Sequence, residues 1–285
     1  MNLDLFETIE KFAQLTKNLD KPDLEKPWAW RSYDGEGIRF AFFRTYEELQ
    51  ELAVKLELER MELGVPITSA QRIFGQYHLA YRDLEAVLLN VAKEIEGTPP
   101  FEGEWSIRET LAHMLAADLG FYVAIRFAME SHHSGVEQPE KFPEEAWEKF
   151  LGLDEEGYDS LMKGSYQSLR EHQAAHHLRV LGDLAYITER ELELGSRYWE
   201  NEEMDLMFRL HRFDSHLRQH TVQMEKTLLA LGITPSESKR LLRHIYRALG
   251  ECENRRIGVP EIGEALCEEV GRIIIERTDE IATIL

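Results

Sequence analysis

Two histidines four residues apart form the clearest chemical pattern in this sequence. The stretch from residue 211 to residue 223 reads HRFDSHLRQHTVQ and contains His216 and His220. On an α-helix of about 3.6 residues per turn, this spacing places both imidazoles on one face, roughly 6 Å apart along the axis. Two imidazoles placed in this way can hold one metal ion between them. The alternative is a pair of histidines that bind no metal.

A lone histidine on a second apolar helix is the natural candidate for a third ligand. His113 lies in the stretch WSIRETLAHML, between Ala112 and Met114. A histidine buried among such neighbours needs either a hydrogen-bond partner or an ion. We therefore take His113 as the candidate third ligand of the His216 and His220 pair.

A rival pair occurs earlier in the chain. His172 and His176 repeat the four-residue spacing and would be an alternative clamp, with His177 beside them. No flanking motif supports this pair, which is more typical of the polar face of a helix. His211 lies about 140° around the helix from His216, so we do not expect the two to bind one ion.

Two carboxylates are candidates for supporting the metal ligands. Metal-bound histidines usually donate the second ring N–H to a carboxylate or carbonyl. Asp118 and Asp214 lie close in sequence to His113 and His216 and could fill this role. The alternative for both is a solvated carboxylate at the surface.

Four segments with a helical pattern would position the histidines, at about residues 68–96, 105–130, 156–186 and 203–231. Ser106, with Glu109 three residues later, matches a capping box at the start of the second segment. The link at 131–155 is long enough to cross a bundle, which allows the second and third helices to run parallel. We therefore predict an all-α protein with a central four-helix bundle.

The regions on either side of the bundle are also expected to be mainly helical. We assign residues 1–67 to an N-terminal extension, 68–232 to the bundle and 233–285 to a C-terminal extension. Ile38–Phe43 is expected to form a short strand, and a helix to begin at Thr45. The N-terminal extension is rich in aromatic residues, namely Trp28, Trp30, Tyr33, Phe40, Phe42 and Phe43. This cluster either packs on the bundle or forms the interface of a homodimer.

Composition excludes several classes of partner. The chain has 285 residues, 43% of them hydrophobic, and a formal net charge of −20. This negative charge disfavours binding to nucleic-acid phosphates and to an anionic membrane surface. Cys252 and Cys267 are the only cysteines, too few for a disulfide framework. With no signal peptide at the start, we expect a cytoplasmic protein.

The order of these motifs resembles the DinB-like superfamily of metal-binding four-helix bundles. The resemblance covers about residues 68–232 and rests on the Trp105-Ser106 opening eight residues before His113, and on the pattern from His216 through His220 to Gln223. It implies an up-down-down-up bundle with a divalent metal ion on the three histidines. The superfamily name refers to DNA damage but implies no DNA contact. The chain departs from the pattern in its long helical extensions, which do not resemble the catalytic domain of the sulfoxide-synthase relatives.

Characterised members of the superfamily are thiol-dependent enzymes. Some transfer a low-molecular-weight thiol to an electrophile, and one is a maleylpyruvate isomerase. Three neutral imidazoles would leave the ion its full charge and an open position, where a thiol would become a nucleophile. The resemblance therefore implies a metal-dependent thiol transferase or isomerase with a small-molecule substrate. A metal-dependent hydrolase and a non-catalytic, metal- or ligand-binding stress-response protein are the alternatives. Zinc and nickel are the first candidate metals, and iron and manganese follow.

Overall fold

The structure is a computed structural model that describes residues 4–139, 143–198 and 202–285. Helices make up most of the described chain, as the sequence predicts. The chain divides into two compact units. The first consists of Met1–Pro66, His78–Asn90 and Gly232–Leu285, and the second of Ile67–Tyr77 and Val91–Leu231.

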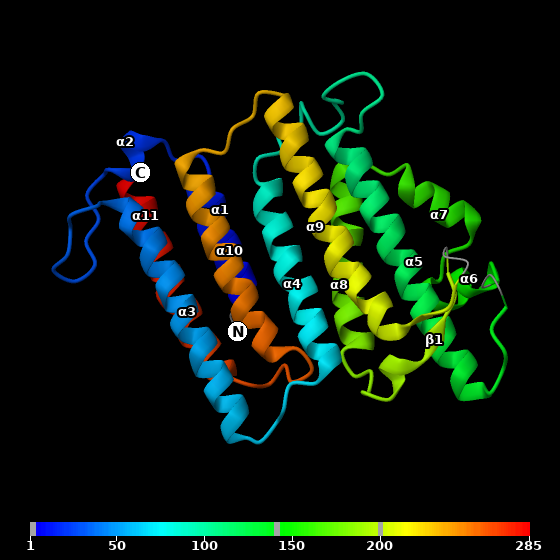
Figure 1. The fold of residues 1–285 in the computed structure, drawn as a ribbon. Coiled ribbons are helices and arrows are strands. Elements are labelled where there is room, and N and C mark those ends of the chain that lie inside the picture. The colour runs from blue at the N-terminus through cyan, green and yellow to red at the C-terminus, as the bar shows by residue number, and fades with distance from the viewer. Residues whose placement is uncertain (1–3, 140–142, 199–201) are drawn as a thin grey trace. The chain divides into compact units, whose positions relative to one another are not determined.

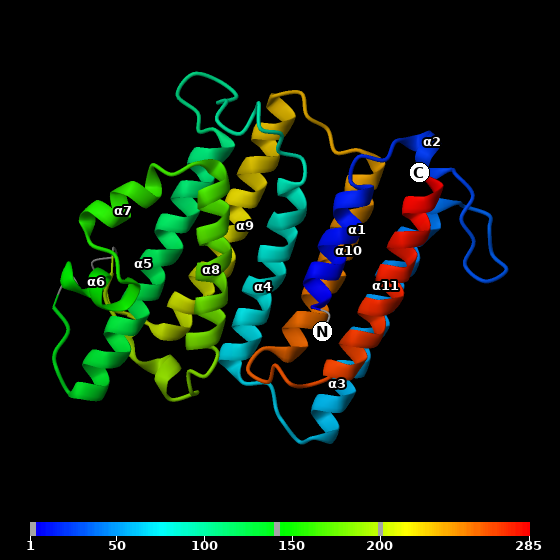
Figure 2. The same ribbon diagram turned by 180° about the vertical axis from the view of Figure 1, so that it is seen from behind.

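The N-terminal and C-terminal regions fold together into the first unit (Figures 1 and 2). Its helices are α1 (Leu5–Thr16), α2 (Lys21–Leu24), α3 (Ile38–Glu62), α10 (Glu237–Arg256) and α11 (Glu264–Ile284). α3 packs against α10 and α11, and α1 packs against the same two helices. Apolar side chains spaced three and four residues apart fill the space between them, among them Ile9, Phe12, Phe42, Leu49, Leu249 and Ile274.

The aromatic cluster of the N-terminal region packs within this unit. Trp28 and Phe42 are buried, and the rings of Trp30 and Tyr33 contact Phe40. The indole N–H of Trp28 donates to Glu280 of α11 over 3.0 Å. A homodimer interface at this cluster stays a prediction.

The second unit is built around α5 (Ile107–Ser134), which packs against both α8 (Tyr166–Leu184) and α9 (Leu206–Ala230). The first part of α4 (Ser69–Leu88) completes a bundle, since Phe74 and Tyr77 contact Phe213 of α9. α4 and α9 run in one direction and α5 and α8 in the other (Figure 2). This is the up-down-down-up order that the resemblance implied.

The long connection between the parallel helices α5 and α8 contains two further helices. These are α6 (Glu145–Leu151) and α7 (Glu155–Met162). A single turn of 3-10 helix at Glu191–Glu193 and a two-stranded antiparallel ladder precede α9. In that ladder, Gly195 of β1 (Gly195–Ser196) pairs with Asp205 of β2 (Met204–Asp205).

The predicted strand at Ile38–Phe43 was wrong, because these residues form the first turns of α3. In a short run of apolar residues, the spacing of the side chains does not distinguish a strand from a buried helix. Thr45 is not a cap either, since its hydroxyl donates back to the carbonyl of Ala41 in mid-helix. Gly37, at a φ of 61°, precedes the helix instead.

Two of the predicted bundle helices were too long. α4 ends at Leu88, and the amide groups of Asn90 turn back onto the carbonyl of Val87. The predicted segment 156–186 is two helices, α7 and α8, because Ser165 caps a new helix by accepting a hydrogen bond from the N–H of Ser168. The helices are therefore shorter than predicted, but each candidate metal ligand still lies on a helix.

α5 is the one described helix that is long and apolar enough to cross a membrane by length and composition. Of the residues in its apolar window, 67% are buried inside the protein. This is the pattern of a core helix.

Candidate metal centre

Local interactions fix the start of α5 and thereby the position of His113. The capping box predicted at Ser106 is confirmed, because its hydroxyl accepts from the N–H of Glu109 and the Glu109 carboxylate accepts from the N–H of Ser106. Arg108 donates to the backbone carbonyls of Met162 and Gly164 and so ties the start of α5 to the turn before α8. His113 follows about two helical turns after the cap.

α9 carries the other two histidines on its buried face. Asp205 caps this helix by accepting from the N–H of Phe208 over 2.7 Å. The apolar residues Phe213, Leu217 and Met224 on the same helix are fully buried. His216 and His220 share that face and are 6% and 5% exposed. The residues that pack α9 against α5 therefore also hold the two imidazoles inside the bundle.

The three histidines meet at their ring nitrogens. Nε2 of His216 lies 3.2 Å from Nε2 of His113 and 3.0 Å from Nε2 of His220. One donor atom from each residue falls within 4.8 Å of the others. Among the described residues, this is the one group of three or more histidine, cysteine or acidic side chains that could hold a metal ion. The sequence had singled out the same three residues.

All three imidazoles are neutral near pH 7. Burial lowers the pKa of each, and the neighbouring imidazoles lower the pKa of His113 and His216 further. The pKa of His216 falls to about 3. The neutral imidazole is the form that can bind a metal ion.

Gln223 supports the site, and sequence reasoning had not given it this role. Its side-chain oxygen accepts the Nδ1–H of His220 over 2.8 Å, which leaves a lone pair on Nε2 of His220. The signal was present, because Gln223 stands three residues after His220 on the same helix face. Asp118 instead accepts from Tyr77 and Gln173, and Asp214 pairs with Arg218, so neither bonds a ligand histidine.

Aromatic rings surround the three imidazoles unevenly. The Phe121 ring lies edge-on to His216 at 5.6 Å on the inner side. Trp105 lies 4.8 Å from the ring of His113 and is 42% exposed. The three imidazoles therefore lie between the buried Phe121 and the partly exposed Trp105, and His113 is the least buried of them.

The arrangement of nitrogens fits a cation. Three neutral imidazoles that present their Nε2 lone pairs to one another repel unless a proton or a cation lies between them. The Nε2 atom of His216 lies 3.2 Å from that of His113 and 3.0 Å from that of His220, and one divalent ion among them would be bound by all three lone pairs. The Nδ1 atom of His216 is buried without a hydrogen-bond partner among the described residues, with or without such an ion.

The rival pair on α8 does not converge with other ligands. His172 is exposed, and its Nδ1 bonds the backbone carbonyl of Ser168 over 2.7 Å. His176 is buried, and its ring stands edge-on to Tyr122. No described side chain joins them in a metal-ligand group.

Comparison with known proteins agrees with the fold. The family model of the DinB superfamily matches residues 76–224, and the chain belongs to this superfamily. The matched segment contains all three histidines and Gln223. Neither a curated protein nor a solved structure matches the chain.

Proposed function

We propose that the chain is a divalent-metal-dependent enzyme that activates a low-molecular-weight thiol for transfer to, or isomerisation of, a small electrophile. His113, His216 and His220 would hold the ion, with zinc and nickel as the first candidates. The observation that carries this proposal is the convergence of three neutral Nε2 atoms with no carboxylate or thiolate among them. Such a ligand set leaves an ion its full positive charge.

The bound ion would supply a positive charge that favours the thiolate form of a thiol near neutral pH. The protein's own residues prepare the place for this chemistry. Gln223 orients His220, and the buried Phe121 packs against His216. Trp105 stands at the exposed edge, where a small substrate would approach.

The carboxylates argue against the hydrolase alternative. A general base near the metal-bound water assists hydrolysis. Asp118 is fully buried and bonds Tyr77 and Gln173, while Asp214 forms an ion pair of 2.6 Å with Arg218. Both are engaged away from the histidines, so a hydrolase would depend on the ion alone to deprotonate water.

Thiol consumption tests the proposal. Protein loaded with Zn²⁺ or Ni²⁺ is mixed with 1-chloro-2,4-dinitrobenzene and, in turn, glutathione, cysteine, cysteinylglycine and 2-mercaptoethanol. We expect metal-dependent consumption of at least one thiol, with loss of that activity in His220→Ala. The exposed Gln219 on the same helix provides the control variant Gln219→Leu, which should keep the activity.

Consumption that is unchanged in His220→Ala would show that the site does not carry the reaction. Cleavage of p-nitrophenyl esters without thiol consumption would favour the hydrolase. Stoichiometric metal without turnover of any thiol or ester would favour the non-catalytic alternative.

A further inference from the structure

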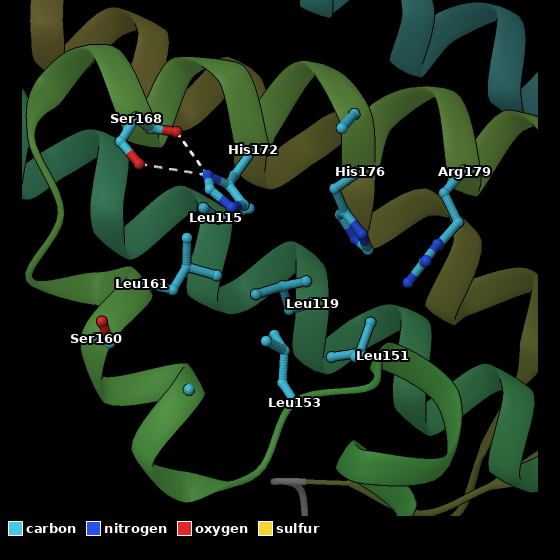
Figure 3. Close-up of a pocket in the computed structure, with 12 residues that line it drawn as sticks. Leu115, Leu119, Leu151, Leu153, Ser160, Leu161, Ser168, His172, His176 and Arg179 are labelled. Atoms are coloured by element: carbon cyan, nitrogen blue, oxygen red, sulfur yellow. Dashed lines mark hydrogen bonds between the residues drawn. The ribbon is translucent and has the colours of Figure 1, made fainter.

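A hollow lies beside α5, and Figure 3 shows the side chains that line it. It has a volume of about 410 Å³ and lies within the second unit, between α5, α7 and α8. Leu115 of α5 lines it and points about 200° around the helix from His113, so the hollow and the metal centre are separate. Its volume falls in the range of small-molecule pockets.

The two sides of this pocket differ in chemistry. One side is apolar and consists of Leu115, Leu119, Leu151, Leu153 and Leu161. The other side is the face of α8 that carries His172, His176 and Arg179, three polar residues spaced four and three apart. A ligand that fills the pocket must therefore be apolar along one side and polar along the other.

His176 offers an unused acceptor to the pocket. The side chain is 6% exposed, and Figure 3 shows its ring directed from α8 toward Leu119. The imidazole bonds the backbone carbonyl of Asp118, while its Nε2 has no hydrogen-bond partner among the described residues. Burial lowers the pKa of His176 to about 4, so the ring is neutral and Nε2 carries a lone pair. A buried acceptor without a partner is destabilising, and a ligand that donates a hydrogen bond would relieve this.

Arg179 offers an unused cation at the edge of the same pocket. The side chain is exposed, and it makes no ion pair or hydrogen bond with the described residues. The nearest carboxylate along α8, Asp183, already pairs with Arg126 over 3.2 Å and accepts from the hydroxyl of Tyr122. The guanidinium is therefore available for an anionic ligand group, and a carboxylate matches its geometry.

We propose that this pocket binds a small amphipathic hydroxy acid, with its carboxylate on Arg179, its hydroxyl on His176 and its hydrocarbon body against the leucines. His176 and Arg179 are three residues apart on one helix face, so their Cβ atoms are about 5–6 Å apart. The long side chain of Arg179 can bring its guanidinium to a carboxylate next to the hydroxyl that bonds His176, as in a 2- or 3-hydroxy acid. This site is independent of the metal centre and of the thiol chemistry proposed for it.

Calorimetric titration of the full-length protein with three related probes tests this proposal. The probes are 3-hydroxyoctanoate, octanoate and 1-octanol. We expect 3-hydroxyoctanoate to bind with one-to-one stoichiometry, and octanoate to bind about tenfold more weakly because it lacks the donor for His176. 1-Octanol lacks the carboxylate and should bind at least tenfold more weakly than 3-hydroxyoctanoate.

Three variants and one control locate the binding. Arg179→Gln should weaken the binding of 3-hydroxyoctanoate about tenfold or more. Arg72→Gln, at an exposed arginine on α4, should leave the affinity unchanged. Ala175→Trp places a large side chain at the exposed rim of the pocket and should abolish binding. His176→Phe should make 3-hydroxyoctanoate and octanoate bind alike; if this variant does not fold, the comparison of the two probes on the parent protein makes the same test.

Three results would overturn the proposal. The first is no binding of any probe at millimolar concentration. The second is equal affinity in the parent, Arg179→Gln and Ala175→Trp. The third is binding that is lost in His216→Ala but kept in Ala175→Trp, which would place the acid at the metal centre instead.

Discussion

His220 donates its Nδ1–H to the side-chain oxygen of Gln223, one turn further along α9, over 2.8 Å. This bond fixes both the orientation of the imidazole and the tautomer that exposes Nε2. Outer partners of this kind typically account for a 10- to 100-fold change in metal affinity. We therefore expect Gln223→Leu to weaken metal binding by about 10- to 100-fold, measured by competition with a chelating dye.

Gln223→Glu distinguishes this role from simple packing. A carboxylate accepts the same Nδ1–H, so this variant should bind metal at least as tightly as the parent. Gln219→Leu, a change of the same type on the exposed face of α9, should leave the affinity unaltered. Equal affinities for Gln223→Leu and Gln219→Leu would contradict the assigned role.

Asp118 should make the stability of the second unit depend on pH. Burial raises the pKa of its carboxyl to about 7, although hydrogen bonds from Gln173 and Tyr77 oppose this. The folded protein thus holds a proton that the unfolded chain has lost above about pH 4. The resulting stabilisation is fully present below that pH and is lost as the pH rises through about 7.

Asp118→Asn removes this titration while keeping the shape of the side chain. Between pH 5.5 and 8.5 the free energy of unfolding of the parent should fall by about 2 kcal/mol more than that of the variant. Urea unfolding at the two pH values measures the difference. Asp154→Asn, at the exposed cap of α7, is the control and should follow the parent. A parallel pH dependence in the parent and Asp118→Asn would show that the carboxyl is charged in the folded state.

Glu253 is the key anion of the first unit. It accepts from Nε and Nη2 of Arg82, both over 2.6 Å, and lies 2.8 Å from Nε2 of His78. Burial would raise the pKa of Glu253, but Arg82 and His78 together lower it to about 2. Glu253→Ala leaves the buried Arg82 without its counter-charge and should lower the free energy of unfolding by about 3–5 kcal/mol.

A surface pair provides the comparison. Glu276 pairs with Arg272 over 2.9 Å, with both side chains well exposed. Glu276→Ala should therefore change the free energy of unfolding by less than about 1 kcal/mol. Urea unfolding of both variants measures the two losses of free energy. Equal losses for Glu253→Ala and Glu276→Ala would contradict the role assigned to Glu253.

The histidine centre could be predicted from sequence because its signals are local. A helix converts the spacing of His216 and His220 into a shared face, and the capping box at Ser106 fixes the start of the helix that carries His113. Gln223 belongs to the same motif, but the sequence does not assign it a role, because helix geometry alone does not determine which nearby polar group an imidazole bonds. Asp118 and Asp214 are close in sequence to the metal ligands, but they bond other residues. Asp118 accepts from Tyr77 and Gln173, and Asp214 accepts from Arg218.

The extensions were harder to predict because their structure depends on contacts between distant parts of the chain. The apolar run at Ile38–Phe43 suits a strand or a buried helix equally, and its packing against α10 and α11 decides the outcome. The second part of α4 clusters with the N- and C-terminal helices, which periodicity within one helix cannot reveal. The pocket beside α8 likewise depends on α7, which the sequence had merged with α8.

Metal content of the purified protein tests the central claim most directly. Elemental analysis and metal titration should give about one divalent ion per chain for the parent and for His172→Ala, and none for His113→Ala, His216→Ala or His220→Ala. Because an ion that binds only the folded state stabilises it, added metal should also raise the melting temperature of the parent and of His172→Ala alone. Full metal retention in His216→Ala, together with loss of metal in His172→Ala, would contradict the account and move the site to α8.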